Sequence, residues 1–363
     1  MLRRALLLFF LLLVFFILNA FVNPIPKKNM VEGFKPNYGV SFSFEQAGWY
    51  GLEGRKSYIE LLDSVEFKWV RLPFFWNQMM DENSNFNSNF EVLKWAISEA
   101  KKRNIDVIIA LGAKTPYYPE YHWPESVSGK VKFGQKIDAN NAAALDILEI
   151  DKKVVSELSG FDNIIFWQIE NEPLLANVNG WVITPSLIKA EIEVVKGTDS
   201  KKRPVILNHV GPTLFDRGYK DLLSLLSPGD VFSVNAYFKT QGTYFLSLGA
   251  FGRKIDIAWP TWLVWPVQSW TFFSVDFENV KKEIEGKGVK FWVLEMQAEP
   301  YIRESEDGLR KSLSFSSGDL GDADKFLRSY RIESVGLWGA HFWQFRQKAG
   351  DDSWIKTVKS VVN

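Results

Sequence analysis

Short apolar runs alternate with amphipathic stretches along the chain, from about Gly33 to its C-terminus. The apolar runs are rich in Val, Ile and Phe, which is typical of parallel strands buried on both faces. The stretches between them place apolar residues on one helical face, as residues 92–100 do with the spacing Val-Leu-x-x-Ala-Ile-x-x-Ala. Strands are predicted at 38–42, 68–72, 105–111, 163–173, 204–208, 231–237, 289–295 and within 335–343, and helices at 55–67, 90–103, 140–158, 185–195, 219–226, 277–285, 323–330 and 354–362.

This alternation of eight strands with eight helices predicts a fold of the α/β class, a single (β/α)8 TIM barrel over residues 34–363. No change of composition divides this region, so one domain is expected. In such a barrel the C-terminal ends of the strands form the mouth, where barrel enzymes place their functional groups. Chemistry is therefore to be sought at the strand ends.

The N-terminus has a different pattern. Arg3 and Arg4 precede an uncharged apolar run, residues 5–22, and residues 23–33 have the composition of a linker. Basic residues before an apolar run indicate an export segment, and this run is long enough to span a bilayer. Residues 1–22 are therefore expected to be a signal peptide or an N-terminal membrane anchor. The poor cleavage sequence around Ala20 favours the anchor. In either case we expect an exported barrel, anchored outside the cytoplasm or secreted.

Composition excludes several classes of partner. The 43 basic residues balance the 43 acidic ones, so no nucleic-acid partner is indicated. Without cysteine there is no disulfide framework or thiolate metal site, and three scattered histidines (His122, His209, His341) predict no metal centre. No cofactor is predicted, and a monomer is expected. The 15 Trp, 11 Tyr and 29 Phe residues fit either a large aromatic core or sugar binding, because flat rings cover the apolar faces of pyranoses.

The fourth predicted strand ends in a burst of polar residues, Gln168-Ile-Glu-Asn-Glu-Pro173. Proline cannot donate to a strand ladder, so pairing is expected to stop there. Gln168, Glu170 and Glu172 share one strand parity and are expected to point the same way. Carboxylates that line a barrel interior require a reason. We interpret Glu172 as the candidate acid and Glu170 as a buried partner of an arginine or an amide.

The seventh predicted strand also ends in a carboxylate, Glu295. In a closed eight-stranded barrel the ends of strands four and seven face each other across the mouth. Two carboxyl groups about 5 Å apart across a glycosidic bond are what a retaining glycosidase needs, one as nucleophile and one as acid/base. Glu299 competes with Glu295 for the nucleophile role, but it follows the strand and precedes Pro300, which favours a loop or subsite role.

The motif Asn171-Glu172-Pro173 and Glu295 resemble the retaining glycoside hydrolases of clan A, which are (β/α)8 barrels, with the cellulase-like family 5 the nearest member. The resemblance covers about Gly39 to Trp343. It implies that Glu172 is the acid/base and Glu295 the nucleophile, and that Asn171 binds the sugar 2-hydroxyl.

The same resemblance implies further substrate-binding residues. Arg71 corresponds to a strand-two arginine that supports the nucleophile, and Tyr237 to a strand-six tyrosine that hydrogen-bonds to it. Trp343 corresponds to the strand-eight tryptophan under the sugar, with Trp338 the second choice. His209, after strand five, is weighed evenly between a substrate contact and a loop histidine.

The sequence departs from family 5 at two places. Ala110-Leu-Gly112 stands where a histidine usually ends strand three, and Asn235 stands two residues before Tyr237 where a histidine is usual. Clan membership is therefore a firmer inference than cellulase activity. Residues 259–273 hold four tryptophans, which indicates either a small packed core or an exposed aromatic surface; packing is favoured, with one or two rings reaching the mouth.

Three functions remain open from the sequence. The favoured one is a retaining β-glycoside hydrolase, or a transglycosylase, that acts by double displacement on O-glycosidic bonds of extracellular or cell-envelope carbohydrate. The second is a catalytically inactive barrel that binds oligosaccharide or polysaccharide, against which the presence of both glutamates argues. The third is a metal-dependent hydrolase, which the lack of a His-x-His cluster disfavours.

Overall fold

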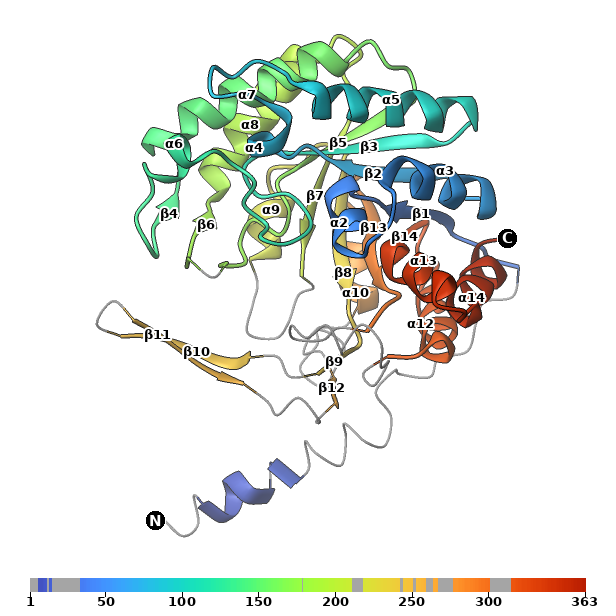
Figure 1. The fold of residues 1–363 in the computed structure, drawn as a ribbon. Coiled ribbons are helices and arrows are strands. Elements are labelled where there is room, and N and C mark those ends of the chain that lie inside the picture. The colour runs from blue at the N-terminus through green and yellow to red at the C-terminus, as the bar shows by residue number, and fades with distance from the viewer. Residues whose placement is uncertain are drawn as a thin grey trace.

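The core of the molecule is a closed barrel of eight parallel strands (Figure 1). The computed structural model describes residues 6–11, 13–14, 33–177, 179–210, 218–241, 244–250, 253–258, 264–266, 277–300 and 315–363. Around the barrel the strands follow the order β1 (Asn37–Ser41), β14 (Ser334–Trp338), β13 (Lys290–Gln297), β8 (Val231–Ala236), β7 (Val205–His209), β5 (Ile164–Ile169), β3 (Asp106–Leu111) and β2 (Trp69–Pro73). The chain visits these strands in sequence order around the ring, so the predicted TIM barrel is confirmed.

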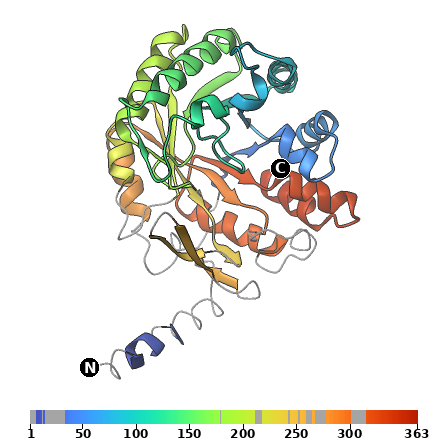
Figure 2. The same ribbon diagram turned by 60° about the vertical axis from the view of Figure 1, so that its left-hand side comes forward.

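Helices surround the strands, as both views show (Figures 1 and 2). The principal helices are α3 (Gly54–Ser64), α5 (Ser88–Lys102), α7 (Ala142–Leu158), α8 (Pro185–Thr198), α9 (Tyr219–Leu223), α10 (Phe277–Glu285), α12 (Ser317–Ser329) and α14 (Ser353–Val362). Shorter helices lie in the loops, namely α2 (Phe44–Trp49), α4 (Trp76–Met79), α6 (Glu125–Ser128) and α13 (Ala340–Lys348). Each predicted helix corresponds to one of the principal helices.

Three small sheets lie outside the barrel in the part of the chain that the structure describes. β4 (Lys136–Ile137) pairs with β6 (Val182–Ile183), β9 (Lys239–Gln241) with β12 (Val264–Pro266), and β10 (Tyr244–Ala250) with β11 (Arg253–Ala258). The last two pairs belong to the long connection that follows β8. The β10–β11 ribbon extends to one side of the barrel in Figure 1.

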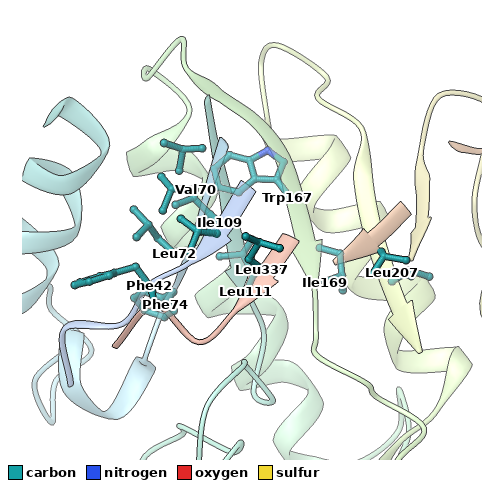
Figure 3. Close-up of a cluster of buried hydrophobic side chains, with 14 of the residues drawn as sticks. Phe42, Val70, Leu72, Phe74, Ile109, Leu111, Trp167, Ile169, Leu207 and Leu337 are labelled. Atoms are coloured by element: carbon teal, nitrogen blue, oxygen red, sulfur yellow. The ribbon is translucent and has the colours of Figure 1, made fainter. Parts of the chain in front are cut away.

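The outer faces of the barrel strands pack against the helices. Figure 3 shows this layer, with Val70 and Leu72 of β2 beside Ile109 and Leu111 of β3. All four side chains are almost fully buried. Burying a side chain of this size contributes about 1.5–3 kcal/mol, so the layer is the main source of the barrel's stability.

The barrel interior is filled by a second apolar cluster, in which three aromatic rings pack with aliphatic side chains. Trp69 and Trp292 stack with centroids 6.3 Å apart, and Phe166 meets Trp292 edge to face. Gly39 makes room for them, because a Cβ there would lie 2.0 Å from the Trp69 indole. The interior is therefore closed below the mouth, and polar chemistry is restricted to the strand ends.

The eighth strand is shorter than predicted. β14 ends at Trp338, and the chain then turns at Gly339 (φ 146°) into helix α13. A Cβ at Gly339 would lie 2.8 Å from the Ala298 carbonyl oxygen, so only glycine allows this turn. Trp343, predicted on strand eight, lies instead on α13.

Two predicted segments fall largely outside the described residues. Within the predicted segment 1–22, residues 6–11 and 13–14 are helical and the others are not described. Among the described residues, no helix is long and apolar enough to cross a membrane. In the tryptophan-rich stretch 259–273, only the backbone of 264–266, strand β12, is described.

Candidate active site

Glu295 lies near the end of β13 with a cation and a phenol on its carboxylate. Arg71, from β2, donates to one carboxylate oxygen at 2.6 Å, and the Tyr237 hydroxyl donates to the other at 2.9 Å. Arg71 is itself fully buried and also donates to Ser41 at 2.8 Å. A buried carboxylate held by a guanidinium and a hydroxyl is stabilised in its ionised form. The structure therefore brings together the three residues predicted here.

Glu172, just past the end of β5, faces the same mouth. Its carboxyl accepts a hydrogen bond from Asn235 of β8 at 2.7 Å. Burial, together with the negative charge of Glu295, raises the pKa of Glu172 to about 7, while Lys114 opposes the rise. A glutamic acid with a pKa near neutrality retains a proton that it can donate.

The turn after β5 separates the two acidic residues on either side of Asn171. Glu170 and Glu172 both have left-handed backbones, with φ of 54° and 45°. Strand alternation ends at Ile169, so parity no longer fixes their directions. The prediction that Gln168, Glu170 and Glu172 point the same way is therefore wrong: Glu172 faces the mouth, and Glu170 faces helices α7 and α8.

Glu170 supports the neighbouring loop. Its carboxylate accepts hydrogen bonds from the backbone N–H groups of Ala113 and Lys114, at 2.8 and 2.5 Å. Gly112 (φ 100°) makes this possible, because a Cβ there would lie 2.3 Å from the Glu170 carboxyl carbon. The partners are backbone amides rather than an arginine. The departure from family 5 at Ala110-Leu-Gly112 is thus the place where this carboxylate packs.

Two further buried carboxyl groups lie behind Glu170, namely Asp151 of α7 and Glu191 of α8. Burial raises the pKa of all three, and the Glu191 carboxyl interacts with those of both Glu170 and Asp151. A hydrogen bond between two carboxyl groups requires one of them to be protonated. No group of three or more acidic or histidine side chains among the described residues is placed to bind a metal ion.

Lys114 fastens the turn that carries Glu172. Its ammonium group is fully buried and donates to the carbonyl oxygens of Glu172 and Leu175, both at 2.8 Å. It also lies 3.5 Å from the Glu120 carboxylate. The Asn171 backbone N–H donates to the Lys114 carbonyl at 2.6 Å. Sequence reasoning missed Lys114, and its place in the loop after an apolar strand gave no signal.

A network of amides positions Asn171. Its Oδ1 accepts from Gln168 at 3.2 Å and from Asn208, on β7, at 2.9 Å. Asn208 Oδ1 in turn accepts from the Glu172 backbone N–H at 2.8 Å. The Asn171 Nδ2 group has no hydrogen bond to any residue that the structure describes. The amide is thus held with its donors available to a ligand.

Trp343 does not occupy the predicted position. It is completely buried on α13, and its indole N–H donates to the Ala298 carbonyl at 2.6 Å. The assignment of Trp343 to strand eight is wrong, because that strand ends five residues earlier, at Trp338. Trp338 is partly exposed, and the Arg71 guanidinium lies 5.7 Å from its ring centre. Trp338 therefore lies beside the Arg71 guanidinium that binds Glu295.

Asn235 and two histidines, His209 and His341, have contrasting surroundings. Asn235, noted in the sequence as a departure, uses its amide to hold Glu172. His209 ends β7 and is buried next to Asn208. His341 is buried on α13, and its Nε2 accepts from the Ser43 backbone N–H at 3.2 Å. Its contacts give His341 a packing role.

Comparison with known proteins agrees with this geometry. Residues 30–240, more than half of the chain, match the family model Cellulase (glycosyl hydrolase family 5). A search of curated proteins found no match. These residues include Arg71, Asn171, Glu172 and Tyr237, while Glu295 lies beyond them.

Solved structures share the fold at low sequence identity. A GH5-4 broad specificity endoglucanase from an uncultured bovine rumen ciliate has 16% identity and a TM-score of 0.51, over 85% of each chain. A GH5_18 protein from Streptomyces cattleya in complex with Manβ1-4GlcNAc has 10% identity and a TM-score of 0.53, over 84% of this chain and 71% of that one. A β-galactosidase from Marinomonas ef1 has 12% identity and a TM-score of 0.51, over 89% of this chain and 61% of that one, so the match spans less than two thirds of that protein.

These likenesses establish the barrel, and the family model establishes the family. Together with the two glutamates at the barrel mouth, they identify an enzyme of the glycoside hydrolase class. The chain belongs to glycosyl hydrolase family 5.

Proposed function

We propose that this chain is a retaining β-glycosidase that cleaves O-glycosidic bonds by double displacement. Glu295 attacks the anomeric carbon, and Glu172 protonates the departing oxygen. The observation that carries the proposal is the unequal environment of the two glutamates. Glu295 is ion-paired to Arg71 at 2.6 Å, whereas burial and the Glu295 charge raise the pKa of Glu172 to about 7.

The two environments fit successive steps of the reaction. Before attack, the negative Glu295 keeps Glu172 protonated as an acid. Once Glu295 has become a neutral ester with the sugar, that repulsion is gone and Glu172 loses its proton more readily. It then acts as a base that activates water to hydrolyse the ester. Transfer of the covalently bound sugar to the hydroxyl of a second sugar in place of water gives transglycosylation, which uses the same residues.

Substrate contacts are proposed on the same basis. The Asn171 Nδ2 group is available to the sugar 2-hydroxyl, and the Trp338 ring supports the sugar in place of Trp343. His209, next to Asn208 at the end of β7, is proposed as an outer contact. The substrate is an oligosaccharide or polysaccharide, and the enzyme is expected to act as a monomer without a cofactor.

Azide rescue tests the division of labour between the glutamates. In Glu172→Ala, an activated aryl glycoside with a good leaving group needs little protonation, so the covalent intermediate forms and accumulates. Added azide attacks it without a general base, and the product is a β-glycosyl azide. Loss of an acid/base costs about 10²–10⁴-fold, so the recovery of turnover is large enough to measure.

Glu295→Ala is the matched comparison, because no intermediate forms and azide restores no β-azide. An α-glycosyl azide from Glu172→Ala would point to an inverting mechanism. Wild-type protein that binds oligosaccharides but turns over no activated glycoside would favour the inactive binding barrel. If Glu299→Ala abolished turnover while Glu295→Ala remained active, the nucleophile would be Glu299.

The site of action is proposed from the sequence of the N-terminus. Arg3 and Arg4 before the apolar run 5–22 support export, with the barrel outside the cytoplasm and the substrate in the cell envelope or beyond it. Membrane fractionation and N-terminal sequencing of the mature protein test this. A mature chain that begins just after Ala20 and is freely secreted would contradict the anchor, and a cytoplasmic chain would contradict export.

A further inference from the structure

A third acidic side chain, Glu299, lies beside the nucleophile and has no part in the reaction described above. The negative charge of Glu295 acts on it, and hydrogen bonding links it to the side chain of Trp338. Trp338 can donate only through its indole N–H. After burial, the negative charge of Glu299 is one of the causes that raise the pKa of the Tyr50, Tyr117 and Tyr237 hydroxyls. It therefore faces a group of aromatic and hydroxyl-bearing side chains at the mouth.

The backbone around Glu299 is rigidly held. The Ala298 N–H donates to the Trp338 carbonyl at 2.9 Å, and the Ala298 carbonyl accepts from the Trp343 indole at 2.6 Å. The Glu299 carbonyl accepts from the Gln297 side chain at 3.2 Å. Gln297 also binds the backbone of Phe238 and Lys239. These bonds fix the backbone from which the Glu299 side chain projects.

The other members of the group come from separate loops. Tyr117, from the loop after β3, packs against Trp338 with ring centres 4.4 Å apart and against His341 at 5.6 Å. Tyr50, at the end of α2, stacks on His341 with ring centres 6.2 Å apart. Neither tyrosine hydroxyl hydrogen-bonds to a residue that the structure describes. Two phenols, a carboxyl group and an indole N–H thus converge near the same ring surface.

The position of this group relative to the two glutamates indicates which part of a substrate it meets. The nucleophile contacts the sugar that becomes covalently bound, and the acid contacts the leaving group. The charges of Arg71, Glu299 and Glu295 lie close enough to Tyr117 to affect the pKa of its hydroxyl. The charge of Glu295 likewise affects the pKa of Glu299. The group therefore adjoins the nucleophile, on the side of the bound sugar.

We propose that Glu299, with the hydroxyls of Tyr117 and Tyr50, is a binding subsite for hydroxyl groups of the sugar on the glycone side. This inference rests on the proposed function and adds the residues that select the glycone. The carboxylate accepts from sugar hydroxyls, and the phenols donate to or accept from them. The aromatic faces of Trp338 and Tyr117 cover the apolar face of the sugar ring. A site built to hydrogen-bond a hydroxyl rejects analogues that lack it.

The choice of hydroxyls over a cationic amine follows from the mixture of groups. The two phenols present donors as well as acceptors, which suits alcohols. A site for an ammonium group would present acceptors alone. Burial and the Glu295 charge raise the pKa of Glu299 to about 7, so near neutrality it is partly a donor as well.

The test pairs single-hydroxyl deletions in the substrate with deletions in the protein. Aryl β-glycosides and their monodeoxy analogues are assayed with wild type, Glu299→Ala and Glu299→Gln. For wild type, kcat/KM is expected to fall about 10–100-fold when the recognised hydroxyl is removed, the usual range for a hydrogen bond to a charged group. Glu299→Ala is expected to lose a similar factor on the parent glycoside and to become indifferent to that same hydroxyl.

A pair of neighbouring tyrosines provides the matched control. Tyr117→Phe removes a hydroxyl inside the proposed subsite and is expected to weaken selection among the deoxy analogues. Tyr118→Phe removes one from a side chain that is 59% exposed and packs near Trp49, and is expected to leave selection unchanged. Equal effects of the two variants would contradict the subsite. Circular dichroism and the melting temperature confirm that each variant is folded.

Binding of S-linked thioglycosides that resist hydrolysis separates this inference from the proposed function. If wild type hydrolyses or binds the parent sugar and Glu299→Ala keeps the same dependence on every hydroxyl, only the subsite is wrong. If wild type neither hydrolyses nor binds any member of the series, the proposed function fails and the subsite with it. If Glu299→Ala loses discrimination only for amino sugars, Glu299 is a cation site and the proposed ligand is wrong.

Discussion

Two groups of buried carboxyl side chains lie on opposite sides of Asn171, and they differ in what surrounds them. At the mouth, Glu295 has the Arg71 guanidinium and the Tyr237 hydroxyl, and Glu172 remains partly exposed. Behind the turn, Glu170, Glu191 and Asp151 are sealed between the barrel and its helices. The Glu191 carboxyl interacts with the other two, and Glu170 accepts from the backbone N–H groups of Ala113 and Lys114.

Burial raises the pKa of Glu172 in the first group and of all three members of the second. A raised pKa therefore does not distinguish the reactive carboxyl from the structural ones. Two features distinguish the carboxyl groups at the mouth: Glu172 is accessible from the mouth, and Glu295 has a cationic partner, Arg71. The first group is thus arranged to change protonation at the mouth, and the second to hold the turn out of reach of solvent.

Replacing one acid in each group by its amide gives the largest contrast. Glu295→Gln is expected to lose turnover by more than the ~10²–10⁴-fold that general acid/base loss costs, because a neutral amide forms no glycosyl ester. Glu191→Gln keeps a neutral group of the same shape and is expected to retain kcat within a few fold. Initial rates on an activated aryl β-glycoside measure both. Equal losses would show that the two groups are not functionally distinct.

Much of this arrangement was predictable from the sequence. Strand ends locate Glu172 and Glu295, because apolar runs of strand length stop at polar residues and a closed barrel brings their C-terminal ends together. Arg71 and Tyr237 were placed by resemblance to the family. The structure puts both on the Glu295 carboxylate. The strand order followed from alternation alone.

The failures have local physical causes. Trp343 was misplaced because an apolar, aromatic run continues from β14 into α13, and only the positive φ of Gly339 separates them. The direction of Glu170 was missed because parity fails once a residue adopts a left-handed backbone. Lys114, Asp151 and Glu191 come together only through tertiary packing, which no pattern within one element records.

Lys114 touches both groups, so its replacement tests how they are connected. Lys114→Met leaves the partly buried carbonyls of Glu172 and Leu175 without their donor, at a cost of about 1–3 kcal/mol for each hydrogen bond to the charged ammonium group. Its positive charge also lowers the pKa of Glu172, so removing it raises that pKa and the basic limb of kcat/KM moves to higher pH. Chemical denaturation and a pH–rate profile measure the two effects.

Lys153→Met on helix α7 is the control. Lys153 donates to the Ser84 carbonyl, and its charge is not among those that shift the pKa of Glu172. It is expected to leave the basic limb unchanged. If Lys114→Met had reduced stability but an unshifted basic limb of kcat/KM, the ammonium group would fix the turn without changing the pKa of Glu172.

The coupling within the first group is open to direct titration. In Glu295→Gln the negative charge that raises the pKa of Glu172 is gone, so that pKa is expected to fall from about 7 toward its ordinary range. Carbon NMR of the labelled glutamate carboxyl measures it without any turnover. An unchanged value would mean that burial alone sets the proton affinity, and that forming the ester would not switch Glu172 from acid to base.

The smallest effect concerns the sealed group and appears in stability rather than rate. Burial and the charges of Glu170 and Asp151 raise the pKa of Glu191 well above its ordinary 4.5. The folded protein therefore binds a proton that the unfolded chain releases. The stabilising contribution is fully present below about pH 4.5 and declines as pH rises toward the folded value, by up to about 1.4 kcal/mol per pH unit. Glu191→Gln keeps a neutral donor at every pH, so its melting temperature is expected to decline less than that of wild type between pH 5 and 8. The difference between the two curves cancels the contributions of Glu172 and Glu299, which both proteins share. Parallel curves would mean that Glu191 is ionised in the folded protein, and the contrast between the two carboxyl groups would lose its basis.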